Sequence, residues 1–316
     1  MKKHFYIILS AVVAFASCNK EAGTGLVADD GQIRFSCEEF DSAVTTRTNP
    51  ASMNNLSLFI SAVGVNGNTS IFTNAPFIRQ GNDWKGEEDR YWPSDEATYN
   101  QNRYRFYACN KEMSGSTVTA EDASLDIVYD YLPNPTYKAT NALNMKHIFA
   151  RVGTMEVLAP DGYTLSDLSV TLQPVTGGTF NFTANNGEGA WTGKNAAGAA
   201  VHILPAHYSS SSVVNIPTAG GRVSVDNDQQ GGLWLVPGEY ELTANYTINR
   251  GDYSKPNVTK TCKVNLVQGA VNNIGPRDSN TPNIPTPEDI EELTFSVTLA
   301  NWDSQNITAD FTGNGN

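Results

Sequence analysis

Apolar and polar residues alternate along most of this chain, and the alternation predicts β-strands. Runs in which every second residue is apolar occupy residues 33–37, 56–62, 104–108, 168–172, 180–182 and 293–299. A period of two places the apolar side chains of a strand on one face, so these strands are expected to be half buried. No stretch of a dozen residues keeps the spacing of an amphipathic helix. Short helical turns are expected only at residues 119–125 and 287–293, where a proline can open the second one.

The clearest pattern lies between residues 233 and 248. Leu233 and Leu235 precede the pair Pro237-Gly238, and every second residue from Tyr240 to Ile248 is apolar. Proline followed by glycine suits the central positions of a type II turn. The segment therefore predicts either a hairpin or a tight corner between two strands.

Many short strands separated by Gly, Asn and Pro predict an all-β protein built from sandwiches. A chain of 316 residues is too long for one sandwich of roughly 100 residues. Two sandwiches in tandem are expected, one over residues 48–145 and one over residues 146–316. The division falls within residues 141–146, where no obvious linker marks it.

The N-terminus has the layout of a secretory signal. Lys2 and Lys3 precede an apolar run over residues 5–15, which is too short to span a bilayer. Ala16-Ser17-Cys18 then looks like a bacterial lipobox, so residues 1–17 are the expected signal peptide and Cys18 the expected lipidation site. Acyl chains such as palmitate on Cys18 would anchor the protein to the outer membrane. The alternative is an ordinary signal with a chance cysteine.

Composition narrows the function classes. Hydrophobic residues make up 40% of the chain, which argues against global disorder. The net charge of -12 disfavours nucleic acid as a partner. Lipidation of Cys18 would leave Cys37, Cys109 and Cys262, which contain no CxxC pair and form neither a disulfide framework nor a zinc site. A Cys109–Cys262 disulfide is the less favoured alternative to free thiols.

No group of residues points to catalysis. His202 and His207 lack the spacing of a helical zinc site, and there is neither a GxSxG elbow nor a GxxxxGK phosphate loop. We therefore expect no enzyme activity, no cofactor and no metal. Trp84, Trp92 and Trp191 lie near polar loops where they could stack on sugars. They motivate the alternative of a surface glycan-binding lipoprotein of a polysaccharide-uptake system.

Arg47 stands in a short stretch of small polar residues after the first predicted strand. Exposed segments of this kind are where trypsin-like proteases cut. The alternative is an ordinary loop arginine.

The chain resembles the fimbrillins, which are major and minor fimbrial lipoproteins of Gram-negative anaerobes. The matching segments run in the expected order over nearly all of the chain: Cys18, Thr45-Thr46-Arg47, Tyr91-Trp92-Pro93, residues 104–108, residues 146–152, residues 235–240 and residues 297–302. Each segment is weak alone, whereas the ordered set is fairly specific.

This resemblance implies two transthyretin-like domains, export as a surface lipoprotein, and assembly into a fimbrium after processing. An arginine-specific protease would cut between Arg47 and Thr48. Residues 18–47 would leave with the first strand, whose apolar residues are Ile33, Phe35 and Cys37. An extended strand of another fimbrial subunit would then fill the groove.

The expected donor strand is the final segment, with Ile307, Ala309 and Phe311 as its apolar residues. The chain is short after Trp302, which favours a subunit at the tip of a fibre. An uncut Arg47 would instead leave an anchor at its base, so stalk, tip and anchor all stay open. The implied partners are other fimbrial subunits, the protease, the membrane lipid, and a host receptor or glycan.

Overall fold

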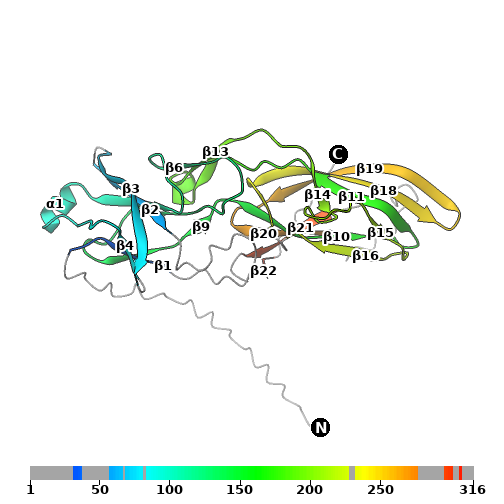
Figure 1. The fold of residues 1–316 in the computed structure, drawn as a ribbon, viewed down its shortest axis with the longest axis horizontal. Coiled ribbons are helices and arrows are strands. Elements are labelled where there is room, and N and C mark those ends of the chain that lie inside the picture. The colour runs from blue at the N-terminus through cyan, green and yellow to red at the C-terminus, as the bar shows by residue number, and fades with distance from the viewer. Residues whose placement is uncertain are drawn as a thin grey trace, which may run out of the picture.

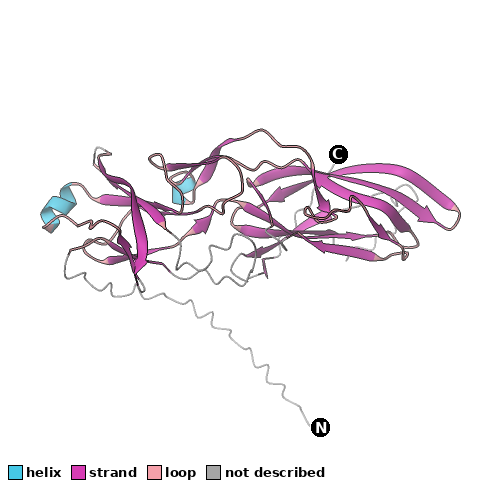
Figure 2. Ribbon diagram, in the orientation of Figure 1, coloured by secondary structure: helices cyan, strands magenta, loops and turns pink. Residues whose placement is uncertain are grey.

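Strands dominate the structure, a computed structural model that describes residues 31–37, 57–66, 68–80, 83–227, 232–276, 295–301 and 306–307. Within these residues the only α-helix is α1 (Glu96–Gln101), accompanied by one 3₁₀ turn (Asn185–Gly187). Figure 2 shows the predominance of strand. The expected all-β class is confirmed. The molecule is elongated, with α1 near one end and the β18–β19 hairpin at the other (Figure 1).

The N-terminal part is built on one eight-stranded sheet, in the order β8-β1-β4-β3-β2-β5-β7-β9. Its strands are β1 (Arg34–Cys37), β2 (Leu58–Gly64), β3 (Ser70–Gln80), β4 (Asp83–Gly86), β5 (Tyr104–Cys109), β7 (Val128–Leu132), β8 (Thr140–Leu143) and β9 (Lys146–His147). Most neighbours are antiparallel, but β1 runs parallel to β8.

This sheet encloses the N-terminal core on one of its faces. The core consists of buried apolar residues from nearly every strand: Ile33, Phe35, Leu58, Ile60, Ala62, Ala75, Phe77, Trp84, Trp92, Tyr99, Tyr104, Phe106, Ala108, Val128, Leu143 and Met145. Alternation predicted the faces of β2 and β5, and both predictions are confirmed at Leu58, Ile60 and Phe106.

The opposite face of the sheet is covered by a three-stranded sheet in the order β13-β12-β6. Its strands are β6 (Thr117–Ala120), β12 (Gly178–Asn181) and β13 (Ala190–Lys194). The second core lies here, and it also contains Trp234 and Val236 from the C-terminal part. The two parts of the chain therefore share buried residues.

The C-terminal part is a sandwich of two sheets around a third core, which includes Val152, Val170, Leu204, Tyr240 and Ile274. One sheet contains β16 (Arg222–Asp226), β10 (Ala150–Leu158), β17 (Leu233–Leu235), β20 (Ala270–Pro276), β21 (Phe295–Asn301) and β22 (Asn306–Ile307). The other contains β14 (Val201–Leu204), β15 (Val214–Ile216), β11 (Thr164–Leu172), β18 (Gly238–Arg250) and β19 (Tyr253–Leu266).

The pair Pro237-Gly238 forms a corner between these two sheets. β17 pairs with β10, whereas β18 pairs with β11 and β19. Gly238 has a φ of 140°, a conformation that side chains disfavour. Of the two predicted alternatives the tight corner is thus confirmed, and the hairpin is wrong.

Two other local expectations differ from the structure. Residues 119–125 are not helical, because residues 119 and 120 end β6 and the rest form bends. Helix α1 was not predicted, since six residues are too few for an apolar periodicity. Its start is nevertheless marked chemically: the Asp95 side chain accepts a hydrogen bond from the Thr98 amide, a standard N-cap.

The division of the chain at residue 145 stays a prediction, as does the transthyretin-like strand order. Residues 140–143 and 146–147, which flank the predicted boundary, form β8 and β9 of the N-terminal sheet.

Candidate functional site

The first strand of the protein lies inside a sheet and not at its edge. β1 is flanked by β4 on one side, antiparallel, and by β8 on the other, parallel. Phe35 is opposite Trp84 on β4 and opposite Asn141 on β8. A strand paired on both sides uses nearly all of its backbone donors and acceptors. β1 therefore completes a ladder that would otherwise be broken between β4 and β8.

The residues just before β1 are also held tightly. The Ile33 amide donates to the Arg90 carbonyl at 2.7 Å, and the Trp92 amide donates to the Gly31 carbonyl at 2.9 Å. The Gln32 side chain donates to the Asp89 carboxylate at 2.6 Å. These bonds extend the antiparallel pairing beyond β4 and fix the position of β1 along the groove.

Two apolar side chains of this segment enter the N-terminal core. Ile33 is 1% exposed and Phe35 is 0% exposed. The Phe35 ring makes edge-to-face contacts with Phe77 and Phe106, with ring centroids 5.4 Å and 5.0 Å apart. Full burial of such a side chain contributes about 1.5–3 kcal/mol. The groove under β1 is therefore an apolar site made of residues that are far from β1 in the sequence.

The structure places only some of the predicted site residues. Ile33 and Phe35 lie on the buried face of the first strand, and Cys37 is the last residue of β1, opposite Leu143. Cys18, Arg47 and Thr48 lie outside the described residues, as do Ala309 and Phe311. Ile307 lies in β22, where it is opposite Leu299 of β21.

Sequence reasoning did not identify the residues that receive β1. The alternating runs gave no signal for the burial of Phe77 and Trp84, and the pairing of β1 with β8 had none either. Parallel pairing joins segments that are distant in the sequence.

β21 and β22 form one side of the C-terminal sheet. β21 pairs with β20 from Ala270 opposite Asn301 to Pro276 opposite Phe295. β22 is paired with β21 alone, which makes it the outermost strand described in that sheet.

The tryptophans do not form a sugar-stacking platform. Trp84 is 1% and Trp92 is 5% exposed, because both rings belong to the N-terminal core. Trp191 is half buried, and its indole donates to the Ile148 carbonyl at 2.9 Å. The expectation that Trp84 and Trp92 could be exposed is wrong, since polar neighbours in the sequence did not reveal that their rings point inward, whereas Trp191 keeps part of its surface exposed.

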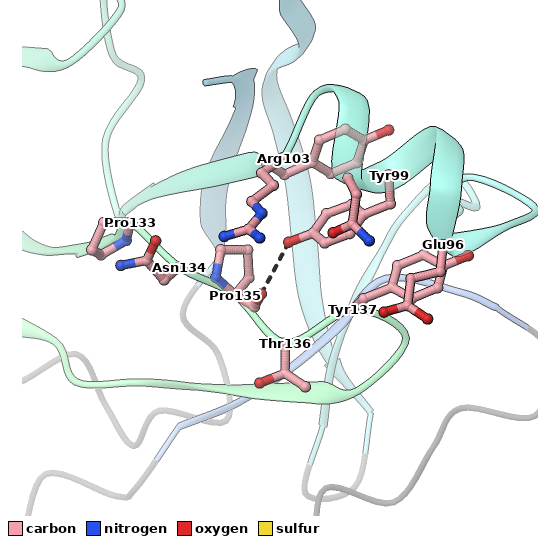
Figure 3. Close-up of a pocket in the computed structure, with 10 residues that line it drawn as sticks. Glu96, Tyr99, Arg103, Pro133, Asn134, Pro135, Thr136 and Tyr137 are labelled. Carbon is pink, nitrogen blue, oxygen red and sulfur yellow. Dashed lines mark hydrogen bonds between the residues drawn. The ribbon is translucent and has the colours of Figure 1, made fainter. Parts of the chain in front are cut away.

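A pocket of about 420 Å³ opens beside α1 (Figure 3). α1 and Tyr99 form one side, and residues 133–137 form the other, where the Tyr99 hydroxyl donates to the Pro135 carbonyl at 3.0 Å. Tyr99 stacks on Tyr137, with centroids 4.8 Å apart. Burial raises the pKa of Tyr99 and of Tyr104, so both hydroxyls stay neutral near pH 7.

Histidines and cysteines occupy structural positions. His147, His202 and His207 are partly buried, as expected, and His147 Nδ1 lies 2.9 Å from an Asp126 carboxylate oxygen. Cys109 and Cys262 are free thiols, which confirms the favoured interpretation. Burial raises the pKa of Cys109 to about 12, so this thiol is protonated and inert at neutral pH.

Over the part of the chain that the structure describes, no cluster of three or more His, Cys, Asp or Glu residues is arranged to hold a metal ion. A membrane-spanning helix of sufficient length and apolarity is likewise not found among those residues.

Comparison with known proteins gives a fold relationship. No family model matches the chain, and no curated protein matches it. Among solved structures, a fimbrial protein from Bacteroides vulgatus shares 15% identity with a TM-score of 0.50, over 85% of this chain and 99% of that one. A proposed cell adhesion protein from Bacteroides ovatus shares 12% identity with a TM-score of 0.42, over 88% of this chain and 98% of that one. The chain therefore has the fold of a bacterial fimbrial protein, in agreement with its resemblance to the fimbrillins.

Proposed function

We propose that this protein is a structural or adhesive subunit of a surface fimbria. In this proposal it is exported as a lipoprotein on Cys18, carried to the outer membrane and cut between Arg47 and Thr48 by an arginine-specific protease. The fold shared with a Bacteroides fimbrial protein supports the role. The partners are other fimbrial subunits.

The observation that carries the proposal is the position of β1. This strand lies between β4 and β8, yet residues 38–57, with Arg47 among them, separate it in sequence from β2. A cut at Arg47 would leave β1 attached only by non-covalent contacts. Its four residues, with the buried Phe35, and the buried Ile33 just before them would then compete with strands of other molecules.

Loss of β1 would expose two unpaired backbone edges and an apolar groove. Unpaired edges recruit strands from other chains, and groove pockets select the side chains that enter. An incoming strand that takes the direction of β1 would run antiparallel to β4 and parallel to β8. It must also present apolar residues where Ile33 and Phe35 now lie.

The C-terminal segment is the proposed donor. Ile307, Ala309 and Phe311 alternate with polar residues, which is the pattern that the groove requires. The described part of this segment, β22, is held by one neighbouring strand only. Its release would therefore break fewer backbone hydrogen bonds than release of an internal strand.

Processing and assembly can be tested together. Protein sheared from the cell surface is analysed by mass spectrometry and by electrophoresis without boiling. The parent should have an N-terminus at Thr48 and form ladders of high molecular weight. Arg47→Ala should keep the lipidated N-terminus at Cys18 and form no ladder.

Arg47→Lys is the matched control, since it keeps the positive charge. An arginine-specific protease should leave Arg47→Lys uncut, whereas limited trypsin treatment should cut it and restore the ladders. Ladders formed by uncut Arg47→Ala protein would refute assembly by removal of β1. An uncut, lipidated parent without polymers would leave the role of a membrane-held anchor or of a surface glycan-binding lipoprotein.

A further inference from the structure

A second pocket, of about 480 Å³, lies on the face of the N-terminal sheet opposite the N-terminal core. Alternation along the strands explains its position. Tyr104, Phe106 and Ala108 of β5 enter the N-terminal core, so Arg105 and Tyr107 must point to the opposite face. Small-molecule sites commonly have volumes of roughly 300–1,000 Å³, and this pocket falls within that range.

Two tyrosine rings form an apolar wall of this pocket. Tyr107 on β5 is directly opposite Tyr131 on β7, and their rings stack with centroids 5.2 Å apart and 13° between the planes. Tyr107 is buried, whereas Tyr131 is only partly buried, so Tyr131 is the ring that a ligand can reach. A flat ring surface at the side of a polar pocket suits the C–H face of a sugar ring.

Hydroxyl groups cover much of the remaining lining. They come from β2, from the start of β3, and from loops next to the three-stranded sheet: Ser61, Ser70, Thr73, Ser116 and Thr183. Hydroxyls both donate and accept hydrogen bonds, as the hydroxyls of a saccharide do. The lining thus matches a ligand with many hydroxyl groups.

Arg105 brings a positive charge to this wall. Its guanidinium donates to the side-chain oxygen of Asn68, which is a neutral acceptor, and its buried Nε has no hydrogen-bond partner. None of the residues that line the pocket is acidic. Among the described residues, therefore, no carboxylate compensates the charge of Arg105, although the whole protein has a net charge of -12.

From these contacts we infer that the pocket binds an acidic saccharide, with its carboxylate on Arg105, its hydroxyls on the serine and threonine side chains, and its ring against Tyr107 and Tyr131. A guanidinium and a carboxylate form paired, charge-assisted hydrogen bonds, which are stronger than neutral ones. This inference goes beyond the proposed role in assembly, because Ile33 and Phe35 enter the N-terminal core, whereas the pocket lies on the other face of the sheet.

Isothermal titration calorimetry on the full mature protein tests the inference. The probes are a disaccharide that contains glucuronic acid, the matching neutral disaccharide of glucose, sodium acetate and a glutamate-rich peptide. The acidic disaccharide should bind at least about tenfold more tightly than any of the other three, and its affinity should fall as salt is added.

Two variants, one that removes a charge and one that fills the pocket, test the site together with a control variant. Arg105→Gln should weaken binding of the acidic disaccharide about tenfold or more, while Arg103→Gln, at the separate pocket beside α1, should leave it unchanged. Thr73→Trp places a large ring at an exposed edge of the pocket and should block binding without loss of folding. Circular dichroism confirms that each variant is folded.

Unchanged affinity in Arg105→Gln, or no binding of the acidic disaccharide up to about 10 mM, would overturn the inference. Tighter binding of the peptide would assign the pocket to a protein partner and overturn it as well. The ladder assay on Arg105→Gln separates the two proposals, because fimbrial assembly should proceed normally in that variant.

Discussion

Phe35→Ala is the sharpest perturbation of the β1 groove. The side chain is 0% exposed and contacts the rings of Phe77 and Phe106. Truncation to alanine therefore removes the stabilising free energy of a fully buried aromatic ring and leaves a cavity. Replacing a buried phenylalanine by alanine typically costs about 3–5 kcal/mol. The two edge-to-face contacts account for roughly 0.5–1.5 kcal/mol each of that cost.

Amide hydrogen exchange is the assay of choice, because it reports the opening of β1 locally. The Ile33 and Trp92 amides hydrogen-bond across this segment, and both should be strongly protected in the uncut parent. A loss of 3–5 kcal/mol corresponds to exchange that is roughly a hundredfold to several thousandfold faster. Urea denaturation of the uncut protein should show a matching shift of the first transition.

Two comparisons make the result decisive. Phe35→Leu keeps most of the apolar volume and should lose clearly less stability than Phe35→Ala. After cleavage at Arg47 and assembly, the substitution should have no effect on the stability of the polymer, because β1 is then gone. A loss below about 1 kcal/mol in the uncut protein would refute the claim that Phe35 anchors the strand. An equal loss in the assembled polymer would refute the claim that β1 is replaced.

Three further predictions concern the rest of the fold. At pH 7.5 a maleimide should not label Cys109 in the native protein but should label it in denaturant, since burial raises the pKa of its thiol to about 12; fast native labelling would contradict the buried position. Burial also raises the pKa of Tyr240 to about 12, above the ordinary value of about 10. The folded state thus favours the neutral hydroxyl, and this stabilisation is complete below pH 10 and is lost as the pH rises towards 12. Tyr240→Phe loses the hydrogen bond to the Val236 carbonyl and should be about 1 kcal/mol less stable than the parent at pH 7. Its stability should fall less than that of the parent as the pH rises above about 10, as urea titrations at neutral and at alkaline pH would show. Asn272→Ala should cost about 2–4 kcal/mol in thermal or urea unfolding, because the buried amide bonds the Arg151 and Ala270 carbonyls and the Val267 amide; a loss below about 1 kcal/mol would mean that water replaces these bonds.

Where the period-two pattern is clear, it by itself determined that the segment is a strand and which side chains the strand buries. Leu58, Phe106, Val170 and Tyr246 are all buried as the alternation predicted. This succeeds because the direction of a side chain on a strand depends only on local backbone geometry. Candidate residues in the first strand, Ile33 and Phe35, were found on the same basis.

Only the tertiary structure decided which strands pair and what the pairs enclose. The insertion of β1 between β4 and β8, and the corner that sends β17 and β18 to different sheets, depend on partners far away in the sequence. Trp84 and Trp92 lie beside polar residues and are nevertheless buried. Arg105 and Tyr131 meet in one pocket because β5 and β7 are adjacent. Alternation says which way a side chain points, but long-range packing decides whether it meets a core, a groove or solvent.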